Sequence, residues 1–150
     1  MDNVYSFLVV VHIFSAIFGV GSLFILSAII RMGKNMQELR FSYEIFNKVH
    51  FYAVVGTISL LISGLTMGAL RHNLFNLAWV QISALLIIIF FIIGPIWLRP
   101  IMKPILELVQ THKGEEIPEE YYRLYRRMIP VEIAIAVIFI LITILMILKP

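Results

Sequence analysis

Four long apolar runs constrain the fold of this 150-residue chain more than any other feature of its sequence. They cover residues 4–30, 49–70, 77–98 and 128–148. Each has about 20 residues or more, so a helix of that length crosses a hydrocarbon core of about 30 Å. The runs lack the alternation of half-buried strands, and therefore predict helices. We expect an all-α integral membrane protein, an antiparallel four-helix bundle that forms one domain over residues 1–150.

The basic residues predict the orientation of the bundle. Ten of the twelve Lys and Arg residues lie between the first and second runs or between the third and fourth. The positive-inside rule places these loops in the cytoplasm and both termini outside. Residues 118–127 start with a proline and acids and end with arginines, a pattern typical of a short amphipathic helix. The basic excess is therefore a topology signal and not a nucleic-acid patch.

His12 is the one titratable side chain in residues 9–30. At 100° per residue it shares a narrow face of small side chains with Ser15 and Gly19. Such a face lets a second helix approach closely, or leaves room for a flat ligand beside the imidazole. Two interpretations stay open: His12 is a packing residue, or it binds a cofactor, since ionisable groups inside a membrane are costly.

Depth in the membrane groups further polar residues with His12 in the outer half of the bundle. Together these residues form a predicted cofactor site, which comprises His12, Ser15, Gly19, Ser63, Met67, His72 and Gln81. A histidine, a thioether and an amide are groups that a haem or metal site uses. The alternative is ordinary helix packing, with methionine filling gaps.

A second polar group lies near the cytoplasmic side. His50 begins the second run, Glu132 begins the fourth, and Arg127 precedes Glu132 by about one turn. A pair between Glu132 and either His50 or Arg127 would satisfy these charges near the interface. A proton entry path or a substrate-contacting site is the alternative.

The remaining motifs narrow the function classes. Gly64 and Gly68 form a GxxxG pattern, which permits close packing inside the bundle or a homodimer. The chain has no cysteine, which excludes disulfides, thiolate metal sites and cysteine nucleophiles. It also lacks HExxH, GxSxG and a Gly-rich phosphate loop. An enzyme built on this chain would therefore work through a bound cofactor.

The early histidine, the basic first loop, "YYRLYRRMIP" and the terminal "LMILKP" resemble a group of small four-helix bacterial membrane proteins. One branch is a family of predicted integral membrane proteins of unknown function. The HemJ-type protoporphyrinogen oxidase is a related branch, and CopD-like membrane proteins are more distantly similar. The HemJ-type resemblance implies haem b at His12, and the resemblance to the group as a whole implies the cytoplasmic membrane of a prokaryote. Gln81 in "WVQIS" stands where that branch has a lysine, so the chain fits the branch of unknown function better.

These observations lead to two hypotheses. The first is a membrane-embedded b-type haem protein with a redox or electron-transfer role, with quinone or porphyrinogen as its partner. If it is an enzyme, it is a haem-dependent membrane oxidoreductase, with protoporphyrinogen oxidation as one form. The second is a non-enzymatic membrane protein, either a copper- or metal-handling accessory or a structural subunit. His12 is then a packing residue.

Overall fold

The computed structural model describes residues 2–150, and within them it contains helices and short connections but no strand. The first span is α1 (Asp2–Ala16), a π-helical turn η1 (Ile17–Gly21) and α2 (Ser22–Ile30). The remaining elements are α3 (Met36–Leu70), the 3-10 turn η2 (His72–Asn76), α4 (Ala78–Ile93), the π-helical turn η3 (Gly94–Leu98), α5 (Arg99–Thr111) and α6 (Glu119–Leu148). Four continuous helices are long and apolar enough to cross a membrane, which confirms the predicted all-α membrane fold.

The helices extend beyond the predicted spans at the end that carries the basic loops. α3 begins at Met36 instead of near residue 49, and the third span continues through α5 to Thr111. Asn35 caps α3, because its side chain accepts a hydrogen bond from the Glu38 amide at 2.8 Å. Hydropathy marks only the part of a helix that lies in lipid, so a hydropathy profile predicts loops for these polar extensions.

The predicted amphipathic helix at residues 118–127 is helical, but it is continuous with the last span. Both segments lie in α6, and Pro130 is inside this helix without ending it. Proline removes the hydrogen bond to the carbonyl four residues earlier, which here belongs to Arg126. Arg126 is exposed at the polar end of the helix, where water can satisfy that carbonyl.

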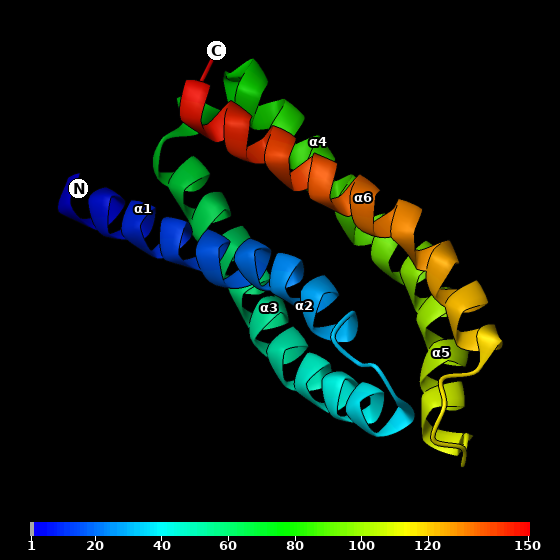
Figure 1. Cartoon of the computed structure of the whole chain (residues 1–150). Helices are drawn as coiled ribbons and strands as arrows, with labels where there is room; N and C mark the ends of the chain where they lie inside the picture. Colours follow the sequence, from blue (N-terminus) through cyan, green and yellow to red (C-terminus); the bar gives the residue numbers. More distant parts are fainter. Residues whose placement is uncertain (1) are drawn as a thin grey trace.

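The four spans pack as two helix pairs (Figure 1). α1, η1 and α2 run along α3, while α4 and α5 pack along α6. The pairs are joined where α3 contacts α5, near the connections at residues 31–35 and 112–118. Both termini lie at the opposite end of the molecule (Figure 1).

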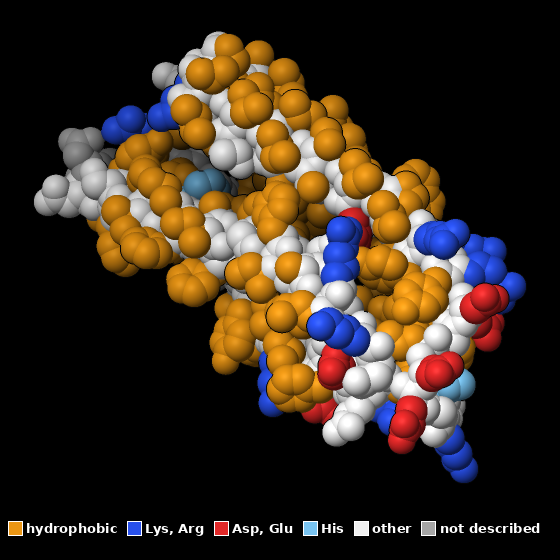
Figure 2. All heavy atoms as spheres, viewed as in Figure 1, with side chains coloured by type: hydrophobic (Ala, Val, Ile, Leu, Met, Phe, Trp, Pro, Cys, Tyr) orange, Lys and Arg blue, Asp and Glu red, His pale blue; other side chains and the backbone are white. Residues whose placement is uncertain are grey.

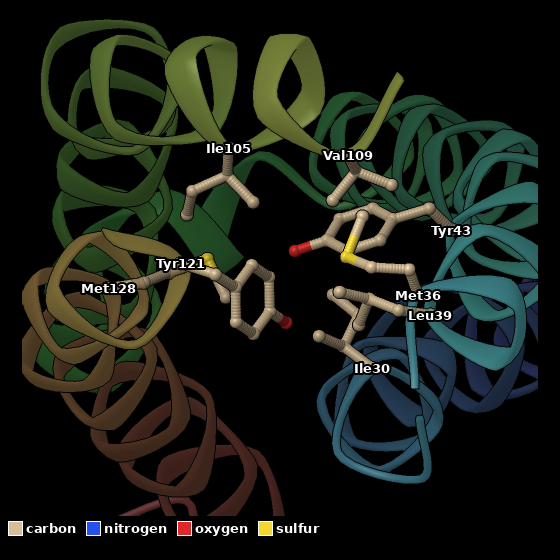
Figure 3. Packing of buried hydrophobic residues seen from close by; sticks show 8 residues of the cluster. All are labelled: Ile30, Met36, Leu39, Tyr43, Ile105, Val109, Tyr121 and Met128. Carbon is tan, nitrogen blue, oxygen red and sulfur yellow. The ribbon is translucent and has the colours of Figure 1, made fainter. Parts of the chain in front are cut away.

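The best-buried core lies at the basic-loop end, in a part that we call the head (residues 36–48 of α3, all of α5 and residues 119–128 of α6). Side chains from α2, α3, α5 and α6 meet there (Figure 3): Ile30, Met36, Leu39, Tyr43, Ile105, Val109, Tyr121 and Met128. At 35 residues, α3 is about 52 Å long, against about 30 Å for the hydrocarbon core. The head therefore projects from the membrane.

Elsewhere the apolar surface faces outward. A smaller core joins α4 to α6, where the rings of Phe90 and Phe139 lie 4.7 Å apart between centroids. Most other large apolar side chains of the spans are exposed. Figure 2 shows them covering the helix pairs, whereas most charged side chains gather around the head. This distribution suits a protein whose spans are solvated by lipid.

Candidate functional site

His12 on α1 contacts Ser63 on α3. The Nδ1 atom of His12 lies 3.0 Å from the Ser63 hydroxyl oxygen. That hydroxyl donates its one proton to the carbonyl of Ser59 at 2.8 Å or of Leu60 at 3.0 Å. With the hydroxyl proton on one of these carbonyls, the serine oxygen accepts a hydrogen bond from His12, and the imidazole proton is then on Nδ1. In that tautomer the Nε2 atom of the neutral ring keeps its lone pair, the form that binds a metal.

The two glycines of the GxxxG pattern make room for rings of the same chain. A Cβ on Gly64 would lie 3.1 Å from Cε1 of His12, so the imidazole rests against this glycine. Gly68 is in still closer contact with the ring of Phe75, which folds back from η2. Both positions are thus occupied within one chain. The homodimer stays a prediction, and the GxxxG pattern no longer supports it.

Gly19, predicted as a cofactor contact, lies where the first span crosses α3. A Cβ on Gly19 would be 2.8 Å from the backbone nitrogen of Thr57, and one on Gly56 would be 2.5 Å from that of Gly19. The backbones therefore touch here, and η1 carries the first span through the crossing. Ser15, one turn earlier, is buried beside the same crossing. These small residues serve helix packing.

The other predicted outer residues are dispersed. Met67 is partly buried one turn beyond Ser63 on α3, and His72 is exposed in η2. Gln81 is exposed on α4, and its amide donates to the Phe75 carbonyl at 3.0 Å. Over residues 2–150 the structure holds no group of three or more His, Asp or Glu side chains that could bind a metal. Of the predicted set, it brings His12 and Ser63 into direct contact.

A cavity of about 420 Å³ lies between the two helix pairs, next to the head. Its walls are mainly apolar and come from α2, α3, α5, α6 and the end of η3. Aromatic and sulfur-containing side chains are prominent among them: Phe24, Phe46, Met102, Met128 and Phe139. Its polar lining consists of Ser27, Arg31, His50 and Glu132.

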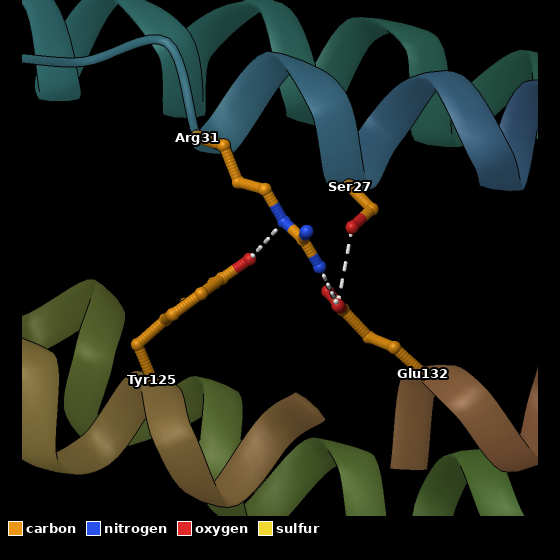
Figure 4. Close-up of polar contacts among 4 residues, drawn as sticks. All are labelled: Ser27, Arg31, Tyr125 and Glu132. Atoms are coloured by element: carbon orange, nitrogen blue, oxygen red, sulfur yellow. Dashed lines mark hydrogen bonds and ion pairs between the residues drawn. The ribbon is translucent and has the colours of Figure 1, made fainter. Parts of the chain in front are cut away.

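A polar bridge connects the helix pairs across this cavity (Figure 4). Arg31, just after α2, pairs with Glu132 of α6 at 3.2 Å and donates to the Tyr125 hydroxyl at 3.0 Å. Ser27 of α2 donates to the same Glu132 carboxylate at 3.1 Å. The hydrogen bond to Tyr125, and then that to Glu132, raise the pKa of Arg31. The guanidinium therefore stays charged at any pH that the protein tolerates.

The ion-pair partner of Glu132 is thus Arg31, and not His50 or Arg127 as predicted. His50 instead lines the same cavity from α3, with its ring stacked on Phe46 at 5.7 Å between centroids. The sequence did hold a signal for the pair. Glu132 is the one acidic residue inside the apolar runs, and Arg31 is the first base after the first run, at the same end of the bundle.

Comparison with known proteins gives one match. The family model described as "Predicted integral membrane protein (DUF2269)" matches residues 6–150. No curated protein and no solved structure matches the chain. A relationship to HemJ-type or CopD-like proteins therefore stays a prediction from the sequence.

Proposed function

We propose that this chain, which belongs to the DUF2269 family of predicted integral membrane proteins, binds a small amphipathic molecule of the quinone class taken from the bilayer. The observation that carries the proposal is the cavity of about 420 Å³ between the helix pairs, with apolar walls and a polar group at the head end. Its volume is within the range of about 300–1,000 Å³ that is usual for small-molecule sites.

The chemistry of the walls favours a flat, uncharged ring. Phe46 and Phe139 offer aromatic faces or edges, and Met102 and Met128 offer polarizable sulfur, which contacts aromatic rings favourably. Arg31 and Glu132 neutralise each other, so an ionic ligand would upset a balanced pair. A neutral ring with carbonyl or hydroxyl oxygens fits the aromatic and sulfur-containing walls and leaves the ion pair balanced.

Two groups that form hydrogen bonds support a quinone in particular. Glu132 on α6 and His50 on α3 line the cavity from different helix pairs. Either group can accept a hydrogen bond from a quinol hydroxyl, and His50 can donate one to a quinone carbonyl. Such a ligand would connect the protein with membrane electron transfer, the role that the sequence predicts.

Haem b at His12 is the second candidate, and the Ser63 contact favours it. A hydrogen bond that fixes the tautomer and orientation of a histidine is the usual support of a metal ligand. His12 would hold the iron through Nε2, and Met67, by its place on α3, is the candidate second ligand. Bound there, haem would supply one-electron redox chemistry. Copper at His12 is less favoured, because the surrounding ligands are few.

Ligand binding tests the cavity. Radiolabelled decylubiquinone is equilibrated with protein in nanodiscs, and the label retained above that of empty nanodiscs gives the affinity. Ala136→Phe places a ring in the cavity, while Ala84→Phe makes the same change at an exposed site on α4. We expect Ala136→Phe to weaken binding by about tenfold or more, or about 1.4 kcal/mol, and Ala84→Phe to have no effect. Equal binding by all three proteins, or none by the wild type, contradicts the proposal.

Absorption spectroscopy tests the second candidate. Protein purified from haem-replete cells is examined oxidised and after reduction with dithionite, beside His12→Ala and His72→Ala. Haem binding predicts a Soret band that His12→Ala removes and that the exposed His72→Ala retains. A wild type that stays colourless after haem addition excludes haem. In that case His12 is a packing or metal-handling residue, as in the non-enzymatic hypothesis.

A further inference from the structure

We infer that the ligand enters the cavity sideways from the bilayer, through an opening between α2 and α6, and that Arg31 selects its head group there. The inference rests on the proposed function, because it concerns access to the same cavity. Its basis is the placement of exposed apolar side chains and of a guanidinium with spare donors along one edge of the cavity.

The cavity is closed by helix packing on one side and by side chains alone on the other. On the closed side α3 packs against α5, and Phe46 and Met102 are partly buried against the head core. On the other side α2 packs along α3, and α6 along α4 and α5, so side chains span the space between α2 and α6. Phe24 of α2 and Ile133 of α6 line the cavity there, yet 49% and 58% of their surfaces are exposed. This α2–α6 opening faces lipid.

The opening runs from the membrane interface into the hydrocarbon. Arg31 follows the last residue of α2, at the end of the apolar run, and Phe24 lies seven residues earlier on the same helix. Seven residues correspond to about 10 Å along the helix axis. An amphipathic molecule in that leaflet therefore presents its polar head at the level of Arg31 and its apolar part at that of Phe24.

Arg31 is placed to contact that head. Its Nε donates to Tyr125 and one Nη2 hydrogen to Glu132, whereas a guanidinium has five N–H donors. Three donors thus remain without a partner among the described residues, on a side chain that is 57% exposed at the edge of the opening. Glu132 and Tyr125 hold the plane of the group, so the free donors have a fixed direction. Lysine has a single ammonium and cannot reproduce this fork.

Cross-linking tests the route. Because the chain has no cysteine, the pair Phe24→Cys and Ile133→Cys supplies the only thiols for a disulfide-containing bifunctional reagent. A matched pair, Arg40→Cys and His112→Cys, joins α3 to the end of α5 in the head, where Arg40 donates to the His112 carbonyl. Association and dissociation rates of decylubiquinone are measured before cross-linking, after it, and after reduction.

We expect the cross-link over the α2–α6 opening to slow both rates at least tenfold, and reduction to restore them. The head cross-link should leave the rates unchanged. Unchanged rates after complete cross-linking of Phe24→Cys and Ile133→Cys overturn the inference while the proposed function stands. Absence of decylubiquinone binding before any cross-linking refutes the proposed function itself, so the two failures are distinguishable.

Substitution of Arg31 tests its selectivity. Affinities for decylubiquinone and for decylbenzene, which has a ring and a chain but no oxygen, are compared in wild type and Arg31→Lys. We expect the wild type to prefer the quinone at least tenfold and Arg31→Lys to lose most of this preference while binding decylbenzene as before. If Arg31→Lys has wild-type helicity and still prefers the quinone, Arg31 does not select the head group. Loss of both affinities assigns Arg31 to cavity structure and refutes its selective role.

Discussion

Replacement of Gly56 by alanine probes the contact that holds the first helix pair together. The new Cβ would lie 2.5 Å from the nitrogen of Gly19 and 2.8 Å from its Cα. Ordinary contact begins at 3.4 Å, so the two helices must separate by about 0.9 Å at their crossing. Because both opposing atoms belong to the backbone, no rotation of a side chain relieves the clash.

The expected loss of unfolding free energy in Gly56→Ala follows from two opposing effects. Overpacking of a close contact costs about 1–3 kcal/mol, and a backbone clash belongs at the upper end of that range. Alanine recovers up to about 1 kcal/mol relative to glycine inside a helix. We therefore expect Gly56→Ala to lower the free energy of unfolding by about 2 kcal/mol. Gly21→Ala is the control, since its Cβ meets nothing within 4 Å. It should be neutral or stabilising by up to about 1 kcal/mol.

Unfolding in mixed micelles by increasing fractions of sodium dodecyl sulfate, followed by circular dichroism, measures both variants. The expected difference in unfolding free energy between the two variants is about 2–3 kcal/mol, which is large for a single methyl group. If Gly56→Ala is as stable as Gly21→Ala, the first span does not cross α3 at Gly19, and the packing described for this helix pair is wrong.

Three further variants test separate contacts. The Tyr43 hydroxyl is buried near Tyr121 (Figure 3) without a hydrogen bond of ordinary geometry among the described residues. Tyr43→Phe should therefore leave stability unchanged in the same titration, or raise it by about 1 kcal/mol. A clear loss would show that this hydroxyl has a partner. Ser63→Ala should cost about 1 kcal/mol through the lost His12 hydrogen bond, whereas Ser63→Thr, which keeps the hydroxyl, should cost less. Equal losses would argue against that bond. Glu132→Gln should lower stability by less than about 1 kcal/mol, because its partner guanidinium is mostly exposed; a larger loss would indicate a more buried pair.

Hydropathy and depth predicted much of this arrangement, because both follow from the length of a helix and the thickness of a membrane. They identify the four spans and predict similar depths for Ser63 and His12, whose side chains are in contact. The sequence predicts helix in the head only at residues 118–127, since the other helical segments there are amphipathic and resemble polar loops in a hydropathy profile. Its core forms only when the helices meet.

The partners of particular side chains depended on tertiary structure. Glu132 was expected to pair with a base nearby in the chain or at the start of the second run, but Arg31 reaches it from the other helix pair. The cavity arises from the separation of the pairs, which no single helix encodes. Gly64 and Gly68 fit a dimer motif in sequence, yet each accommodates a ring that comes from elsewhere in the same chain.

The continuity of the long helices has a mechanical consequence. α3 and α6 each run without interruption from the head into the walls of the cavity, so the head and the walls are parts of the same stiff rods. If such a helix tilts at its projecting end, the part of the helix beyond the membrane interface moves in the opposite direction. A protein that binds the head would therefore change the width of the gap between α2 and α6 without contacting the lipid.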